Sequence, residues 1–458
     1  MLQTIVNAFK IADLRKKILF TALILLIFRI GSAIPVPFLD SSVFGAAVGT
    51  GLLTDAQQNT FLGYLSMMTG DAFNYGTIFA MGITPYINSS IIMQLLTVAI
   101  PALERLQKEG EEGRKKIASI TRYVTIGLGL LQSTAYYFYV RSKDYLATDV
   151  NGNAFAGGWA VFQAAVIILC FTAGTALIMW LGEQINDKGV GNGVSLILFA
   201  GIVARIPTMI TQLFSTTNGY LANGGPYWFL SPFAALLFLL MIAYIVLMDN
   251  SERRIPVQYA KRVVGRKMYG GQSTHIPIKV NMGGVMPIIF ASSILSLPPT
   301  IQMFFSSRIE GTGWEKFFGV FNQTHWAYAI IYFVLIIGFA YFYASIQYNP
   351  IEMSNNIRKQ SGTIPGIRPG EPTAAFIRKI LSKITLLGAL MISVVAIFPI
   401  LFSQITTFVL THLDPPYTGG MNISLGGTSV IIVVGVALET VKQLESQMMM
   451  RHYRGFLD

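Results

Sequence analysis

The chain has 458 residues, of which 53% are hydrophobic and only 12% are charged. Soluble domains carry about 25% charged residues, so this sequence has too little charge to cover a water-exposed surface. Lys and Arg together number 33 and Asp and Glu 22, a formal net charge of +11. These values exclude an ordinary cytosolic enzyme and a disordered or fibrous protein, and they indicate a membrane protein with many spans. The one cysteine, Cys170, excludes an internal disulfide and a thiolate cluster.

Ten segments are long and apolar enough to cross the hydrocarbon core, which takes about 20 residues of helix. In chain order they lie at residues 18–38, 76–100, 120–140, 158–181, 194–213, 228–248, 285–305, 326–346, 384–403 and 426–441. The first is not a cleavable signal peptide, because its apolar run is too long and no small-residue cleavage site follows. A shorter apolar stretch, 61–69, precedes the second span and ends where Gly70 and Asp71 break the chain. We expect it to be a short or re-entrant helix enclosed by protein or a water-filled cavity.

The basic residues lie mostly on one side of these spans. With the N-terminus placed in the cytoplasm, 27 Lys and Arg residues fall on the cytoplasmic side, counted to the ends of the spans, and 4 on the other side. Arg29 and Arg205 lie within spans. Cytoplasmic loops carry the excess of Lys and Arg, so we expect both termini to be cytoplasmic.

The ten spans divide into an N-terminal half, 1–213, and a C-terminal half, 214–458. Because each half has an odd number of spans, the second half enters the membrane in the opposite sense, as in an inverted repeat with a pathway between the halves. Ten spans always divide into two fives, and we see no sequence similarity between the halves. The arithmetic alone therefore leaves the repeat open.

Two predicted cytoplasmic loops, 249–284 and 347–378, are long and basic. They could be topology determinants beside anionic lipid, where each charge contributes about 1 kcal/mol. Topology needs only a few charges near the span ends, however, and the second loop also carries Pro and Gly residues at 365–370. We therefore favour docking surfaces for a soluble partner with an acidic or phosphate-rich surface, including ribosomal RNA.

The sequence carries no recognisable catalytic, cofactor or metal motif. There is no Gly-x-x-x-x-Gly-Lys-Ser/Thr phosphate loop, and the four histidines are scattered over loops. Ion-coupled carriers need ionisable side chains inside the bundle, whereas Glu183, Asp249 and Glu439 lie at span ends and only Arg29 is well inside. Small, weakly polar residues in the spans fit close helix packing or a seam that opens, and at single positions we favour packing.

Several motifs together resemble the SecY family of bacterial protein-conducting channel subunits, along nearly the whole chain. They include Phe28-Arg-Ile-Gly-Ser32, Trp180-Leu-Gly-Glu-Gln184 and Pro365-Gly-Ile-Arg-Pro-Gly370. Further matching stretches lie at 79–83, 85–87, 94–97, 109–115, 188–193, 272–275, 277–281 and 426–429. The resemblance rests on their order and spacing rather than on any one of them.

The resemblance implies an all-α polytopic membrane protein whose two inverted five-helix halves form a clamshell around a central hourglass pore. A ring of aliphatic residues would narrow the pore, at Ile83, Ile87, Val194, Leu198, Ile289 and Ile432. A plug, residues 61–71, would close it through its apolar side chains, Phe61, Leu62, Leu65, Met67 and Met68. A narrow apolar constriction dewets and blocks ions, and it tolerates many substrates because it makes no specific hydrogen bonds.

The resemblance also implies a lateral gate between the second and seventh spans, lined by Ile87, Asn88, Ile91, Ile289, Ser292 and Ser293. Signal sequences would leave through it into lipid. The docking residues for the motor SecA or for the ribosome would be Arg253, Arg254, Lys261, Arg262 and Arg368.

The expected protein is thus the central subunit of a heterotrimer with SecE and SecG in the bacterial cytoplasmic membrane, near anionic lipids. It would pass secretory and membrane polypeptides without a catalytic residue or cofactor. Two other classes compete with this interpretation. A secondary transporter or lipid-linked flippase would place buried charge at a midplane pocket, and a docking scaffold would need neither a plug nor an aliphatic ring.

Overall fold

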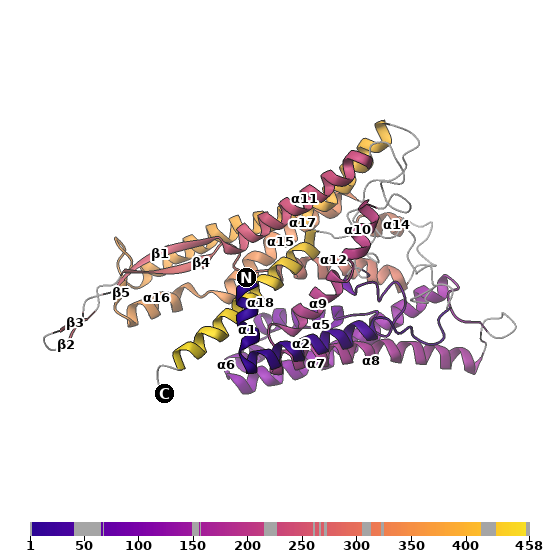
Figure 1. The fold of residues 1–458 in the computed structure, drawn as a ribbon, viewed down its shortest axis with the longest axis horizontal. Helices are drawn as coiled ribbons and strands as arrows, with labels where there is room; N and C mark the ends of the chain where they lie inside the picture. The colour runs from indigo at the N-terminus through magenta and orange to yellow at the C-terminus, as the bar shows by residue number, and fades with distance from the viewer. Residues whose placement is uncertain are drawn as a thin grey trace.

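The computed structural model describes residues 2–454 except 41–65, 67, 149–154, 156, 215–226, 260, 261, 265, 266, 270–272, 305–312, 322–324 and 414–426. Long helices run roughly side by side and form the body of the molecule, and a β ribbon projects from one end (Figure 1). The chain is mostly helical, as predicted, and the strands lie in the two basic loops.

The first half of the described chain is helical. Its elements are α1 (Leu2–Lys10), α2 (Ala12–Gly31), α5 (Thr84–Ala99), α6 (Pro101–Lys108), α7 (Glu111–Ser142), α8 (Gly158–Lys188), α9 (Gly193–Val203) and α10 (Ile206–Phe214).

The second half combines helices with short strands. Its helices are α11 (Tyr227–Asn250), α12 (Met286–Phe304), α14 (Gly313–Gly319), α15 (Trp326–Gln347), α16 (Pro350–Lys359), α17 (Glu371–Leu413) and α18 (Gly427–Arg454). Its strands are β1 (Glu252–Tyr259), β2 (Arg262–Val264), β3 (Lys267–Tyr269), β4 (Ser273–Lys279) and β5 (Gly362–Thr363).

A helix or a pair of helices overlaps each of the ten predicted spans, and two of the differences from the predicted bounds lie near the predicted ring and plug. The second span begins at Thr84 instead of 76, because Gly76 and Gly82 adopt positive φ values of 56° and 57° and delay the helix. The fifth span is broken between α9 and α10. Pro207 follows this break, and it has no N–H to donate to the carbonyl four residues earlier, that of Val203, which its ring also crowds.

Length and composition alone select fewer helices than the ten predicted spans. Four described helical segments qualify as membrane-spanning: Gly158–Lys188, Trp228–Asn250, Trp326–Lys359 and Glu371–Val409. Helices α5 and α6, bent by 101°, make a fifth if the pair counts as one span. Two shorter apolar helices, Gly193–Thr208 and Met286–Gln302, lie among them. The chain is therefore a multi-pass membrane protein.

Helices α9, α12 and α18 lie in the middle of the body, where the two predicted halves meet. Helix α12 packs against α5 and α7, and α18 packs against α9 and α1. In Figure 1 the indigo and purple helices lie together on one side, α11, α15 and α17 on the other, and α9, α12 and α18 between them. The largest buried hydrophobic cluster draws residues from both halves, so the core of the body lies at this junction.

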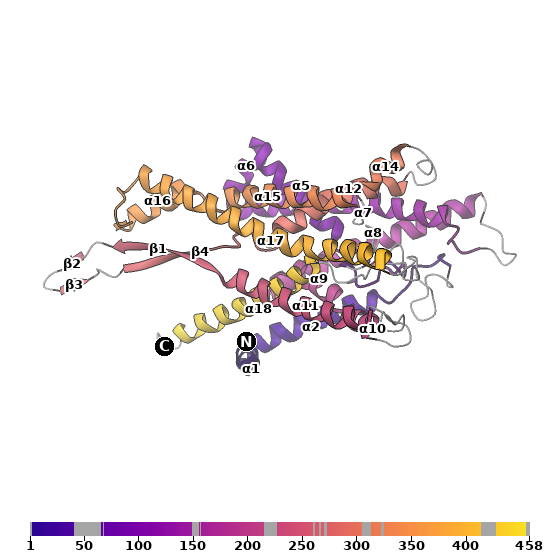
Figure 2. The same ribbon diagram turned by 90° about the horizontal axis from the view of Figure 1, so that it is seen from above.

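The two basic loops fold as one unit outside the helical body. Strands β1 and β4 pair antiparallel from Glu252↔Lys279 to Gln258↔Ser273, and β5 pairs with the other edge of β1. A separate buried cluster lies beneath them, with Ile255 and Val257 from the first loop and Ile357 and Ile364 from the second. Figure 2 shows the ribbon of β1 and β4 extending past α16, with β2 and β3 at its tip.

Candidate functional site: an apolar constriction and a helix seam

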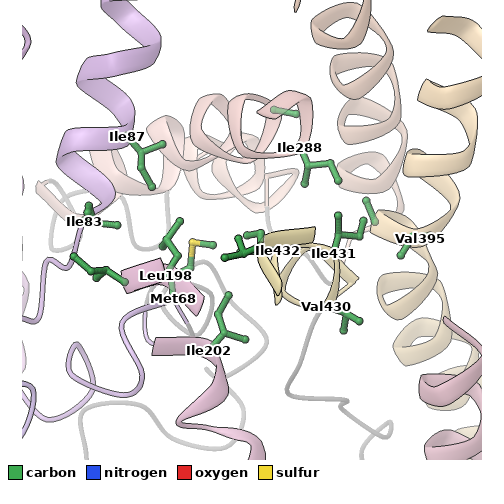
Figure 3. Close-up of a cluster of buried hydrophobic side chains, with 14 of the residues drawn as sticks. Met68, Ile83, Ile87, Leu198, Ile202, Ile288, Val395, Val430, Ile431 and Ile432 are labelled. Carbon is green, nitrogen blue, oxygen red and sulfur yellow. The ribbon is translucent and has the colours of Figure 1, made fainter. Parts of the chain in front are cut away.

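The six predicted ring residues lie in one hydrophobic cluster. Ile83, Ile87, Leu198 and Ile432 are buried members of it, while Val194 and Ile289 are partly buried and pack against it. Four separate helices bring them together, α5, α9, α12 and α18, of which the first two belong to one predicted half and the last two to the other. The cluster thus holds a set of aliphatic side chains at the junction of the halves (Figure 3).

Helix α9 positions its two ring residues by starting in close contact with α8. The Asn192 side chain caps the helix, accepting hydrogen bonds from the backbone N–H groups of Val194 and Ser195 at 3.1 and 3.4 Å. A Cβ atom on Gly193 would lie 2.0 Å from the carbonyl oxygen of Gly182 in α8. Only glycine permits this approach, which holds the start of α9, with Val194 and, one turn later, Leu198, against α8.

Helix α5 presents Ile83 and Ile87 from its first turns. Ile83 is the N-cap residue and Ile87 follows one turn later, with the Ile87 N–H donating to the Ile83 carbonyl at 3.1 Å. Pro85 lies in the first turn, where its missing N–H leaves no helical hydrogen bond unmade. The two side chains therefore line the same face of the helix.

Met68 is the one predicted plug side chain that the structure describes, and it lies within the same cluster. It is 6% exposed, and Figure 3 shows its side chain between Leu198 and Ile432. Phe61, Leu62, Leu65 and Met67 lie outside the described residues. The described end of the segment thus places a flexible thioether among the aliphatic residues, a side chain suited to filling irregular gaps.

Residues after the plug segment are anchored by side chains that the sequence alone did not single out. The buried Tyr136 hydroxyl in α7 donates a hydrogen bond to the Phe73 carbonyl at 2.9 Å. Its ring contacts Phe73 and Phe171 edge to face, at centroid distances of 4.8 and 5.0 Å. A tyrosine in an otherwise apolar span was the available signal, because a buried hydroxyl needs a partner.

The predicted gate residues lie on α5 and α12, two helices that contact each other. Ile87, Asn88, Ile91 and Ser292 are buried, and Ile289 and Ser293 are partly buried. The Ser292 hydroxyl donates to the Ile289 carbonyl of its own helix at 3.0 Å. The Asn88 Oδ1 atom is buried without a hydrogen-bond partner among the described residues. Helix α5 therefore carries a buried polar atom that the surrounding packing leaves without a hydrogen bond.

The predicted docking residues divide between described and undescribed positions. Arg253 and Arg254 are exposed on β1, and Arg368 is exposed in the turn before α17. The Arg368 carbonyl accepts a hydrogen bond from the Thr373 hydroxyl at 2.8 Å, which ties this turn to α17. Lys261 lies outside the described residues, and the Arg262 backbone belongs to β2. The described basic residues project from the single unit formed by both loops.

The side chains gathered at the junction of the halves are mostly hydrophobic. Within the described part of the chain, no group of three or more His, Cys, Asp or Glu side chains could hold a metal ion. The six predicted ring residues that meet there are aliphatic, and an apolar constriction gates by excluding water.

The chain is similar to known proteins in both sequence and fold. The SecY family model matches residues 77–441. The protein translocase subunit SecY of Streptomyces galbus is 41% identical over 459 residues, and that of Halalkalibacterium halodurans is 44% identical over 466 residues. Both alignments cover the whole of each chain.

Solved structures show the same fold at low sequence identity. The structure described as a protein conducting channel matches with a TM-score of 0.59 and 17% identity, covering 95% of this chain and 92% of that one. Sec61 in the canine ribosome-channel complex from the endoplasmic reticulum matches with a TM-score of 0.56 and 16% identity, at the same coverage. On the identity and coverage of its relatives, this chain belongs to the SecY family of protein translocase subunits.

Proposed function

We propose that the chain forms a passive, gated channel that moves unfolded secretory polypeptides across the bacterial cytoplasmic membrane. One observation carries this proposal: six aliphatic residues from both halves meet in one cluster, with Met68 of the predicted plug among them. Such a constriction blocks water and ions when closed. Because it has no directional hydrogen-bonding groups, it accommodates side chains of many kinds as a polypeptide passes.

The seam between α5 and α12 supports a second movement, the lateral release of membrane-protein helices. A hydrophobic signal sequence would leave through this seam because lipid burial contributes about 25 cal/mol for each Å² of apolar surface. The buried Asn88 Oδ1 atom without a partner makes the closed seam less stable than a fully apolar one. The proposed lateral gate comprises Ile87, Asn88 and Ile91 on α5 and Ile289, Ser292 and Ser293 on α12.

The proposed partners are the small subunits SecE and SecG, the motor SecA and the ribosome. Arg253, Arg254 and Arg368 are exposed on the unit that joins both basic loops, and this supports a shared docking surface for SecA and the ribosome. Two structural neighbours are described in ribosome complexes, the canine Sec61 complex and the yeast Ssh1 complex, the second with a TM-score of 0.55. SecA, the ribosome or the membrane potential would supply the energy for transport. Both termini of the chain would lie in the cytoplasm.

A crosslinking experiment tests the channel directly. Cysteines replace Ile87 and Ile289 in a Cys170→Ser background, and the chain is expressed with its small subunits, SecA and a stalled secretory polypeptide that carries its own cysteine. Adducts from both positions are expected. Bound SecA without adducts would instead favour a docking scaffold, and the proposed ring and gate would both be wrong.

A further inference from the structure

Two arginines lie within predicted spans, and both contact the end of the predicted plug. Arg29 belongs to α2, and its Nη1 atom donates a hydrogen bond to the Gly70 carbonyl at 3.2 Å. Arg205 lies in the break between α9 and α10, with its Nε atom 3.2 Å from Asp71 Oδ2. Charge at membrane depth is costly and usually functional. Because both arginines contact neighbouring residues, Gly70 and Asp71, we expect them to have a function at this segment.

The segment before Asp71 forms a turn that presents its carboxylate to Arg205. The Asp71 N–H donates to the Ser66 carbonyl at 2.8 Å, and the Ser66 hydroxyl donates to Asp71 Oδ1 at 2.9 Å. Asp71 has a φ of 69°, in the left-handed region that Asp and Asn enter more readily than most residues. The same turn contains Met68, so the position of Asp71 and that of Met68 are linked by a short, hydrogen-bonded stretch of backbone.

The backbone of α9 lies directly against this turn. A Cβ atom on Gly201 would lie 2.6 Å from the Met68 carbonyl oxygen, and one on Gly70 would lie 2.9 Å from the Gly201 carbonyl oxygen. The two glycines thus bring the turn into contact with the helix that carries Leu198. Arg205 follows at the end of α9, where its side chain faces Asp71.

The ion pair between Asp71 and Arg205 has a geometry that can break. The two side chains are 22% and 11% exposed, and the Arg205 Nε atom makes no hydrogen bond despite its short distance from the carboxylate. Bidentate, hydrogen-bonded arginine pairs are the strong ones, and this pair lacks that arrangement. It can hold the turn in place without locking it.

We propose that Asp71 and Arg205 are positioning residues that hold the end of the plug, and with it Met68, against the ring. The ion pair would form when the channel is closed and separate when the plug leaves. This inference rests on the channel function proposed above, because it assigns the pair to the plug of that channel.

The test measures how accessible position 68 is. The full chain carries Met68→Cys and Cys170→Ser, is assembled with its small subunits in native membrane vesicles, and reacts with a membrane-impermeant maleimide. We expect Arg205→Gln or Asp71→Asn to speed labelling about tenfold, which corresponds to about 1.4 kcal/mol. Asparagine suits position 71 because it also tolerates a positive φ.

A double-mutant cycle separates the pair from a general loss of packing. If the two residues act through each other, the double variant Asp71→Asn/Arg205→Gln labels no faster than either single variant. Arg205→Lys retains the charge and is expected to keep labelling slow. Arg141→Gln, at an exposed position near the end of α7, is the matched control and is expected to change nothing. Additive accelerations, or unchanged labelling in single variants present at normal membrane levels, would overturn the proposal.

Ion leak distinguishes a failure of this inference from a failure of the channel function. If deleting 61–69 causes a leak while Arg205→Gln neither leaks nor labels faster, the plug stands and the positioning role is wrong. If the deletion causes no leak while Arg205→Gln still labels faster, the pair does position Met68 and the sealing role of the plug is wrong.

Discussion

Gln258 in β1 pairs with Thr363 in β5, so the two basic loops meet in one sheet. The Thr363 hydroxyl also donates to the Gln258 carbonyl at 3.4 Å, and the Tyr259 hydroxyl donates to Gln360 Oε1 at 3.3 Å. Charges on the two loops are therefore carried by one hydrogen-bonded unit. Any partner that binds this unit is positioned by both loops at once.

Reversing one charge in this unit tests the docking role. We expect Arg368→Glu to reduce SecA-driven secretion by about tenfold or more while the subunit still assembles, because it places a carboxylate where an acidic or phosphate-rich partner would bind. Translocation of a labelled preprotein into inverted vesicles measures the effect. Arg114→Glu is the matched control, since Arg114 is also exposed, on α7, and lies outside both basic loops. Full activity of Arg368→Glu would contradict the assignment.

Removing the predicted plug tests the seal. Deleting residues 61–69 is expected to raise the ion conductance of membranes that contain the channel, because it removes most of the predicted plug from the aliphatic cluster. Planar-bilayer recording measures the conductance. A deletion of equal length within 214–226, the predicted loop between the fifth and sixth spans, controls for shortening of the chain. Equal conductance in the two deletions would show that this segment is not the seal.

Replacing Asn88 tests the seam between α5 and α12. A buried acceptor without a partner costs about 1–3 kcal/mol, and an opened seam would give Asn88 Oδ1 access to new partners. Asn88→Leu has a similar shape and no polar atom, so it should stabilise the closed seam by about 1 kcal/mol. We expect slower lateral release of a model membrane helix, measured by its rate of lipid crosslinking. Ser89→Ala is the control, because the buried Ser89 hydroxyl donates within its own helix to Pro85; faster release in Asn88→Leu would refute the argument.

A single methyl group at position 193 tests the packing that positions α9. Gly193→Ala would place its Cβ 2.0 Å from the Gly182 carbonyl oxygen, a distance that backbone atoms cannot accommodate without moving. We expect a loss of about 3 kcal/mol, read as a lower unfolding temperature of the purified complex in detergent. Gly127→Ala in α7 is the control, since a Cβ there would have no neighbour within 4 Å. Equal unfolding temperatures would mean that α8 and α9 are not held by this contact.

The predicted ring residues follow from the family resemblance and not from any local feature of the sequence. Ile83, Val194 and Ile432 are ordinary aliphatic residues in apolar spans, so only the motifs around them single them out. The structure brings all six ring residues into one cluster. Their role in the pore stays a prediction, which the proposed crosslinks examine.

The apolar segments, and the side on which the basic residues are predicted to gather, can be read directly from the sequence. Both are local properties: about 20 apolar residues make a span, and charge near its ends orients it. The lack of catalytic motifs was equally readable from residue types and their spacing.

Which distant residues meet becomes visible only in the folded chain. There the basic loops are joined through β1 and β5, the fifth span is broken before Pro207, and Arg205 lies beside Asp71. These relationships depend on glycine contacts between helices and on partners far apart in the chain. Hydropathy and local spacing do not predict these contacts, because they form and stabilise the protein only when helices that are distant in the sequence pack together.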